Sequence, residues 1–252
     1  MKRESFGSRL GFILVSAGCA IGIGNVWKFP YICGAYGGAA FILIYLCFLV
    51  ILGIPVLVAE FAVGRGSHTS VAKCFDKLAP AGSGWKPLKF IGIIGCYMLM
   101  MFYTTVGGWM IYYCVKSLRG DFVGATPEAV TQSFSDMLGN APTMMLWMVI
   151  ICLIGFAVCF MGLQNGIEKI SKVMMSALLI IMVILAVHSV MMEGAGEGIS
   201  FYLIPDFQKI KEAGVGNVVF AALSQSFFTL SIGIGAMLIF GSYLDKSRSL
   251  TG

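Results

Sequence analysis

The sequence contains few charged side chains and very few histidines. Asp, Glu, Lys and Arg make up only 12% of the 252 residues, and histidine occurs twice, at His68 and His188. The eight cysteines include no Cys-x-x-Cys pair of the kind that binds zinc. Aspartate pairs, Ser/His sets and His/Glu sets are missing from the middle of the apolar segments. These absences argue against an enzyme, and the lack of a concentrated basic surface argues against nucleic-acid binding.

Apolar residues are abundant instead. They make up 58% of the chain, and the mean hydropathy is +0.90, so a water-soluble globule would expose more apolar surface than such folds carry. A membrane-spanning helix needs about 20 apolar residues. The sequence therefore predicts an all-α polytopic membrane protein, a single transmembrane domain over residues 1–252, with six spans at about 10–35, 39–63, 90–115, 143–161, 173–192 and 218–243.

Positive charge is distributed unevenly between the connecting segments. Lys and Arg are retained in short cytoplasmic loops of membrane proteins. With the N-terminus in the cytoplasm, twelve of them lie on the inner side and four on the outer side, namely Lys116, Arg119, Lys209 and Lys211. We therefore expect a multi-pass protein of the plasma (inner) membrane with a cytoplasmic N-terminus.

Local signals predict short structures between the spans. Val71–Phe75, on the cytoplasmic side, is expected to form a short interfacial helix. Thr126-Pro127-Glu128 is a helix-start signal in the first long outer loop, and a further helix is expected near 206–213. Residues 162–166 are expected to be a tight connection between spans four and five.

The first span carries residues that interrupt a helix. Gly18, Gly22 and Gly24 each weaken helix propensity by about 1 kcal/mol relative to alanine, and Asn25 adds an amide that hydrocarbon does not tolerate unpaired. Backbone groups freed at bilayer depth must be satisfied by protein, water or ligand. The break therefore predicts a cavity that binds an ion or a polar solute. A similar mixture of polar residues and glycines over 225–235 predicts a second break in span six, and such a pair is typical of a transporter site.

These segments resemble the neurotransmitter:sodium symporter family. The resemblance is carried by Arg9-Leu10-Gly11, by the run from Ala17 to Pro30, and by four further stretches over most of the chain: Gly37–Phe41 and Gly53–Arg65 (with Gly53-Ile54-Pro55 and Glu60–Arg65), Gly166–Lys169 and Gln225–Gly235. It implies a leucine-transporter fold of two inverted repeats. The chain would contain the first inverted repeat plus the opening helix of the second, with spans one and six broken.

The resemblance also implies a function. A member of this family is a sodium-coupled symporter that works by alternating access, and the substrate implied here is an apolar or aromatic amino acid. A complete member is about twice as long, so the chain is expected to be a truncated part of the transporter, with the remaining half as its partner. The alternative is a non-transporting, membrane-embedded binding or scaffold module.

Sodium ligands can be carried over residue by residue. The resemblance implies one co-transported Na⁺ at the carbonyl of Ala20, the side chain of Asn25, and the hydroxyl and carbonyl of Thr229. A second Na⁺ would bind the carbonyls of Gly18 and Ile21. The alternative for the glycines is close helix packing. Part of a chloride site is matched by Tyr45, Gln225 and Thr229, but its deciding residue belongs to a seventh helix, so chloride dependence stays open.

The resemblance further implies a substrate site. The substrate carboxylate would meet the amides near Ile23 and Gly24 and the Tyr103 hydroxyl. Family members that transport monoamines carry an aspartate at the position of Gly22, so glycine favours a substrate with its own carboxylate. The ammonium group would meet the carbonyls of Ala20, Phe228, Thr229 and Ser231, and the side chain would meet Leu99, Phe102, Phe228, Ser231 and Ile234.

Four residues resemble gating positions of the family. Arg3, with the neighbouring Phe6, matches the inner gate, and Lys28 and Phe228 match the outer gate. Lysine replaces the family's usual arginine at position 28 and loses its bidentate fork; the alternative is a lysine that extends to the outer interface. Glu60 is either a buried anchor to nearby backbone or a solvated charge at the end of span two.

Overall fold

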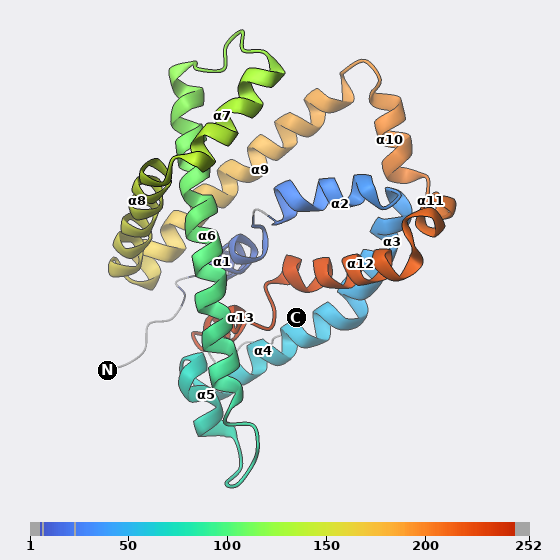
Figure 1. Ribbon diagram of the computed structural model, residues 1–252. Coiled ribbons are helices and arrows are strands. Elements are labelled where there is room, and N and C mark those ends of the chain that lie inside the picture. The colour runs from blue at the N-terminus through green and yellow to red at the C-terminus, as the bar shows by residue number, and fades with distance from the viewer. Residues whose placement is uncertain (1–5, 7, 23, 245–252) are drawn as a thin grey trace. The chain divides into compact units, whose positions relative to one another are not determined.

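The computed structural model describes residue 6 and residues 8–22 and 24–244. Every regular element in this part of the chain is helical, as expected. The chain divides into two compact units, one made of residues 1–92 and 163–252 and the other of residues 93–162. Figure 1 shows the course of the helices.

The first predicted span is broken. Helix α1 (Arg9–Ala20) is followed by a π-helical turn, η1 (Gly24–Lys28), and by helix α2 (Phe29–Ala35), and the axis bends by 56° at the break. The side chain of Ser8 caps α1 by accepting a hydrogen bond from the Gly11 N–H. The predicted interruption at the glycines and Asn25 is therefore present.

The second predicted span is one long helical stretch. Helix α3 (Ala39–Phe48), the π-helical turn η2 (Leu49–Gly53) and helix α4 (Ile54–Ser67) follow one another directly. The stretch ends at His68, whose φ of 49° lies in the left-handed region. Helix α5 (Val71–Leu78) then forms around the predicted interfacial segment, and helix α6 (Leu88–Arg119) follows it.

Helix formation around the fifth span begins earlier than the apolar pattern indicates. The π-helical turn η3 (Leu163–Glu168) leads directly into helix α9 (Lys169–Val190). Most of the expected connection at 162–166 is therefore helical. The reason is that Glu168 and Lys172 form an ion pair on one helix face, with 2.7 Å between Oε1 and Nζ, so these charges do not end the helix.

The segment that closes the first unit contains four helices. They are α10 (Ala195–Leu203), α11 (Phe207–Ala213), α12 (Val215–Leu230) and α13 (Ala236–Gly241). Helix α11 lies where the sequence predicts a helix, and Asp206 caps it by accepting from the Gln208 N–H at 3.0 Å. Between α12 and α13 the helix is interrupted as expected, and Ser231, Gly233 and Gly235 all have positive φ.

The second unit holds the rest of α6 together with α7 (Pro127–Gly139) and α8 (Ala141–Phe160). Thr126 caps α7 through its side chain, as predicted. Gly108 allows α6 to approach α8 closely, because a Cβ at this position would lie 2.9 Å from the Met148 backbone nitrogen.

Within the first unit, distant segments pack side by side: α12 against α3, α13 against α4, and α1 against α9 (Figure 1). Phe41, Cys33 and Val218 belong to a buried core between α2, α3 and α12. Four helical stretches of the described residues are long and apolar enough to cross a membrane: 39–67, 88–119, 141–160 and 163–190. The number is up to six if each of two bent pairs, α1 with η1–α2 and α11 with α12, counts as one span.

Candidate ion and substrate site

Hydrogen bonds connect the breaks of the first and sixth predicted spans. The Thr229 hydroxyl, near the end of α12, donates to Asn25 Oδ1 at 2.9 Å. The Ser231 hydroxyl, just after α12, donates to the Cys19 carbonyl at 2.8 Å. The two interruptions therefore face each other, and their polar groups form one site.

Asn25 satisfies backbone that the break releases. Its Nδ2 donates to the carbonyl of Ala20, the last residue of α1, at 2.8 Å. Its own N–H donates to the Gly22 carbonyl at 3.0 Å. The Ala20 carbonyl also accepts from the Gly22 N–H at 3.1 Å, so the Asn25 amide adds a second donor to a carbonyl at the break, where backbone groups in an apolar environment require partners.

Gln225 and Tyr45 extend this network. Gln225 is 1% exposed, and its Nε2 lies 3.3 Å from Asn25 Oδ1. The Tyr45 hydroxyl donates to Thr229 Oγ1 at 3.1 Å. The structure therefore brings together the three residues expected at the first sodium ion, Ala20, Asn25 and Thr229. It also brings together the partial chloride set, which shares Thr229 with them.

The chemistry of this cluster suits a hard monovalent cation. The Ala20 carbonyl, Asn25 Oδ1 and Thr229 Oγ1 are neutral oxygens, the donor type that such cations prefer. In the structure the oxygens are joined by hydrogen bonds from Asn25 Nδ2 and the Thr229 hydroxyl. For a cation to bind among these oxygens, the Asn25 N–H and the Thr229 O–H would have to rotate away from them. Binding would therefore replace these hydrogen bonds by contacts between the oxygens and the cation.

The residues expected at the second sodium ion lie on a separate cavity. Gly18 and Ile21 line a space of about 620 Å³ together with residues of η3, α9 and α13. Most of the lining is apolar, and Ser171 contributes a hydroxyl. The cavity is next to the break, but its described walls offer few oxygen atoms.

Phe228 lies directly over the first break. A Cβ added to Gly24 would overlap the Phe228 ring, so only glycine fits this approach without a shift. The Lys28 Nζ is 5.6 Å from the centroid of the same ring, within cation–π range. Of the expected gating residues, Lys28 and Phe228 are thus in contact. Arg3, and Ile23 of the substrate set, lie outside the described residues.

The remaining substrate residues are divided between the two units. Ile234 lies half-buried in the break after α12. Leu99, Phe102 and Tyr103 lie on α6 in the second unit, where the Phe102 and Tyr103 rings meet edge to face at 5.7 Å. Their place in a common pocket with Gly22, Gly24 and Ser231 stays a prediction.

Glu60 is an anchor to backbone. Its Oε1 accepts a hydrogen bond from the Gly233 N–H in the break between α12 and α13. Of the two interpretations of the sequence, the anchor to nearby backbone is therefore the one observed, on a half-buried side chain. No comparable signal in the sequence identifies the Cys19 carbonyl as the acceptor of Ser231, because a backbone acceptor is independent of residue type.

The chain is similar in sequence and in structure to known proteins. The profile of the sodium:neurotransmitter symporter family matches residues 3–137 and 127–252. An uncharacterized sodium-dependent transporter of Bacillus subtilis, YhdH, is 35% identical over 99% of this chain and 54% of its own length. The human sodium- and chloride-dependent taurine transporter is 28% identical over 96% of this chain and 44% of its own length.

A solved structure shares the fold. The crystal structure of MhsT in complex with L-phenylalanine is 36% identical and superposes with a TM-score of 0.87, over 98% of this chain and 55% of MhsT. The chain spans about half the length of the curated relatives that it matches.

These findings confirm the predicted fold class and a multi-pass membrane protein. The relatives are transporters rather than enzymes. The chain belongs to the sodium:neurotransmitter symporter family.

Proposed function

We propose that this chain forms part of a sodium-coupled symporter that carries an apolar or aromatic amino acid across the plasma membrane by alternating access, with its N-terminus in the cytoplasm. The observation that carries the proposal is the 2.9 Å hydrogen bond between Thr229 and Asn25. The two residues are 204 positions apart in sequence, and the bond joins the regions where the first and sixth predicted spans are interrupted. Irregular backbone at membrane depth is the usual position of coupled substrate and ion sites in transporters.

Sodium is the proposed coupling ion. Ala20, Asn25 and Thr229 supply neutral oxygens within one hydrogen-bonded cluster, and several relatives are named sodium-dependent transporters. In this proposal the remaining ligands of the sodium ion come from the substrate and from further segments of the complete protein. Chloride dependence is not part of the proposal, because Tyr45, Gln225 and Thr229 form only part of the family's site.

An apolar or aromatic amino acid is the proposed substrate. MhsT, which shares the fold, is solved with L-phenylalanine bound. In this chain Gly22 adds no negative charge that would compete with a substrate carboxylate. The ring of Phe228 and the side chain of Ile234 would provide apolar contacts, with Leu99, Phe102 and Tyr103 as the proposed remainder of the pocket.

The test is uptake by the complete protein that carries these residues, reconstituted in sealed vesicles. Labelled leucine, phenylalanine, tryptophan and tyrosine are each offered with an inward sodium gradient, and with sodium replaced by potassium. We expect uptake of at least one of them that depends on sodium. Uptake that is equal in potassium contradicts the coupling, whereas no uptake of any of the four supports a non-transporting binding or scaffold module.

A further inference from the structure

The segment between α4 and α6 must lie at one face of the membrane. The long apolar stretch that contains α4 ends at Ser67, and α6 begins at Leu88. Helix α5, between them, has eight residues and is therefore about 12 Å long at 1.5 Å per residue, much shorter than a bilayer. The chain thus leaves and re-enters the membrane on the same side, and residues 68–87 remain close to the lipid headgroups.

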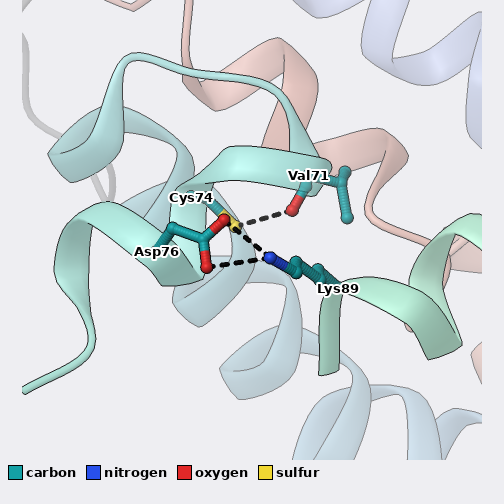
Figure 2. A network of polar contacts seen from close by, with 4 residues as sticks. All are labelled: Val71, Cys74, Asp76 and Lys89. Atoms are coloured by element: carbon teal, nitrogen blue, oxygen red, sulfur yellow. Dashed lines mark hydrogen bonds and ion pairs between the residues drawn. The ribbon is translucent and has the colours of Figure 1, made fainter. Parts of the chain in front are cut away.

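This segment is strongly basic. Residues 64–92 contain five basic side chains (Arg65, Lys73, Lys77, Lys86 and Lys89) and one acidic side chain, Asp76. Figure 2 shows that Lys89 pairs with Asp76, with Nζ 2.8 and 3.0 Å from the two carboxylate oxygens. The single negative charge is therefore already matched within the chain.

Two of the lysines in this segment have no partner within the described part of the chain. Lys77 Nζ donates to the Ser67 carbonyl at 2.7 Å and thereby caps the end of α4. Lys73 and Lys86 are exposed, and neither has a hydrogen-bond or ion-pair partner among the described residues. Their ammonium groups are free to meet an anion from outside.

Helix α5 presents this charge away from the protein. Val71 and Cys74 are buried and pack with Leu238 in one cluster, and the Cys74 thiol donates to the Val71 carbonyl (Figure 2). Lys73, Asp76 and Lys77 lie on the exposed side. Leu78, the last residue of α5, and Trp85, in the turn that follows, are exposed as well, and Trp85 is 61% accessible. We call Lys73, Leu78, Trp85 and Lys86 the α5 surface.

We propose that the α5 surface binds the headgroups of anionic phospholipids at the face of the bilayer where α4 ends and α6 begins. Lysine ammonium groups attract the phosphates of such lipids, and tryptophan is enriched at the membrane interface, where its ring meets the headgroup level. The exposed Leu78 and Trp85 favour a lipid over a soluble anion, because a free phosphate offers no apolar layer. The proposal does not depend on the transported substrate or on the coupling ion.

The experiment compares two lipids around Trp85. The complete protein is placed in nanodiscs of phosphatidylcholine with one fifth phosphatidylglycerol, and either lipid carries bromine atoms near the head of its acyl chain. The quenching of Trp85 fluorescence is obtained by subtracting the signal of the Trp85→Phe variant from that of the wild type, because the chain has three other tryptophans. We expect brominated phosphatidylglycerol to quench Trp85 more strongly, per mole fraction, than brominated phosphatidylcholine.

The lysines are tested with a matched control. Lys73→Gln/Lys86→Gln should reduce the preference for phosphatidylglycerol by up to about tenfold at low salt, since each basic residue near an anionic surface contributes. Arg119→Gln/Lys211→Gln removes the same charge from exposed residues elsewhere and should leave the preference unchanged. Equal quenching by the two lipids, or a preference that survives the Lys73/Lys86 change, would overturn the proposal. Loss of the preference for phosphatidylglycerol on adding inorganic phosphate at constant ionic strength would also overturn the proposal, because it would indicate a site for small anions.

Discussion

Glu168, at the start of α9, accepts a hydrogen bond from the Ser8 hydroxyl, 160 residues earlier in the chain, at 3.2 Å. The same Ser8 oxygen accepts from the Gly11 N–H and so caps α1. Glu168 is 3% exposed, and it also forms an ion pair with Lys172. One buried carboxylate therefore connects the first turns of two helices that pack against each other.

Replacing Lys172 by methionine should destabilise the protein. The change removes the Lys172 ammonium group from the buried Glu168 carboxylate, and removing one partner of a buried ion pair costs about 3–5 kcal/mol. Because the Lys172 side chain is 36% exposed, we expect a smaller loss, on the order of 1–2 kcal/mol. Thermal unfolding of the purified protein in detergent should show a Tm lowered by several degrees. Lys172→Arg keeps the charge and serves as the control; an unchanged Tm for Lys172→Met would contradict the role given to the pair.

Gly24→Ala should disturb the aromatic side chain over the site. The new methyl group would overlap the Phe228 ring, and overpacking of this kind costs about 1–3 kcal/mol. Gly34→Ala is a matched control on α2, because a Cβ there meets nothing within 4 Å. We expect a lower Tm and reduced amino-acid uptake for Gly24→Ala, with both close to wild type for Gly34→Ala. Equal behaviour of the two variants would show that Phe228 moves aside without cost.

Local signals were enough to predict most helices and both breaks. Thr126 and Asp206 cap their helices through side chains that lie beside the helix in sequence, and the glycines near positions 22 and 233 mark interruptions for the same local reason. A contact between distant segments has no such signal. Glu168 lies among lysines in the sequence, which is typical of a solvated loop, and its burial depends on the position of α1 against α9.

In the candidate site, too, local features were predictable from the sequence and contacts between distant residues were not. Asn25 alone predicts a polar group that must find a partner, but its partner Thr229 was identified through the family resemblance, since 204 residues separate them. The π-helical turns at 24–28 and 163–168 were not predicted.

Asn25→Ala should weaken sodium activation of uptake. The substitution removes the Oδ1 ligand proposed for the cation and one of the two donors to the Ala20 carbonyl, the other being the Gly22 N–H. A loss of about 1.4 kcal/mol or more in ion binding corresponds to at least a tenfold higher half-activating sodium concentration. Asn217→Ala, an exposed asparagine on the same α12 as Thr229, should not change it. Sodium titrations of uptake that are identical for wild type and Asn25→Ala would exclude Asn25 as a ligand.

Gly22→Asp should abolish amino-acid uptake, and Gly22→Asn should retain more of it. The carbonyl of Gly22 accepts from the Asn25 N–H, so residue 22 belongs to the break at which the substrate carboxylate is proposed to bind. A fixed aspartate there would repel that carboxylate, and like charges brought together cost several kcal/mol; about 3 kcal/mol is roughly a hundredfold. Asparagine has nearly the same shape without the charge, so comparing labelled phenylalanine uptake by the two variants separates charge from steric disturbance. Equal losses would mean that position 22 excludes any side chain, and the charge argument for an intact amino acid would then no longer hold.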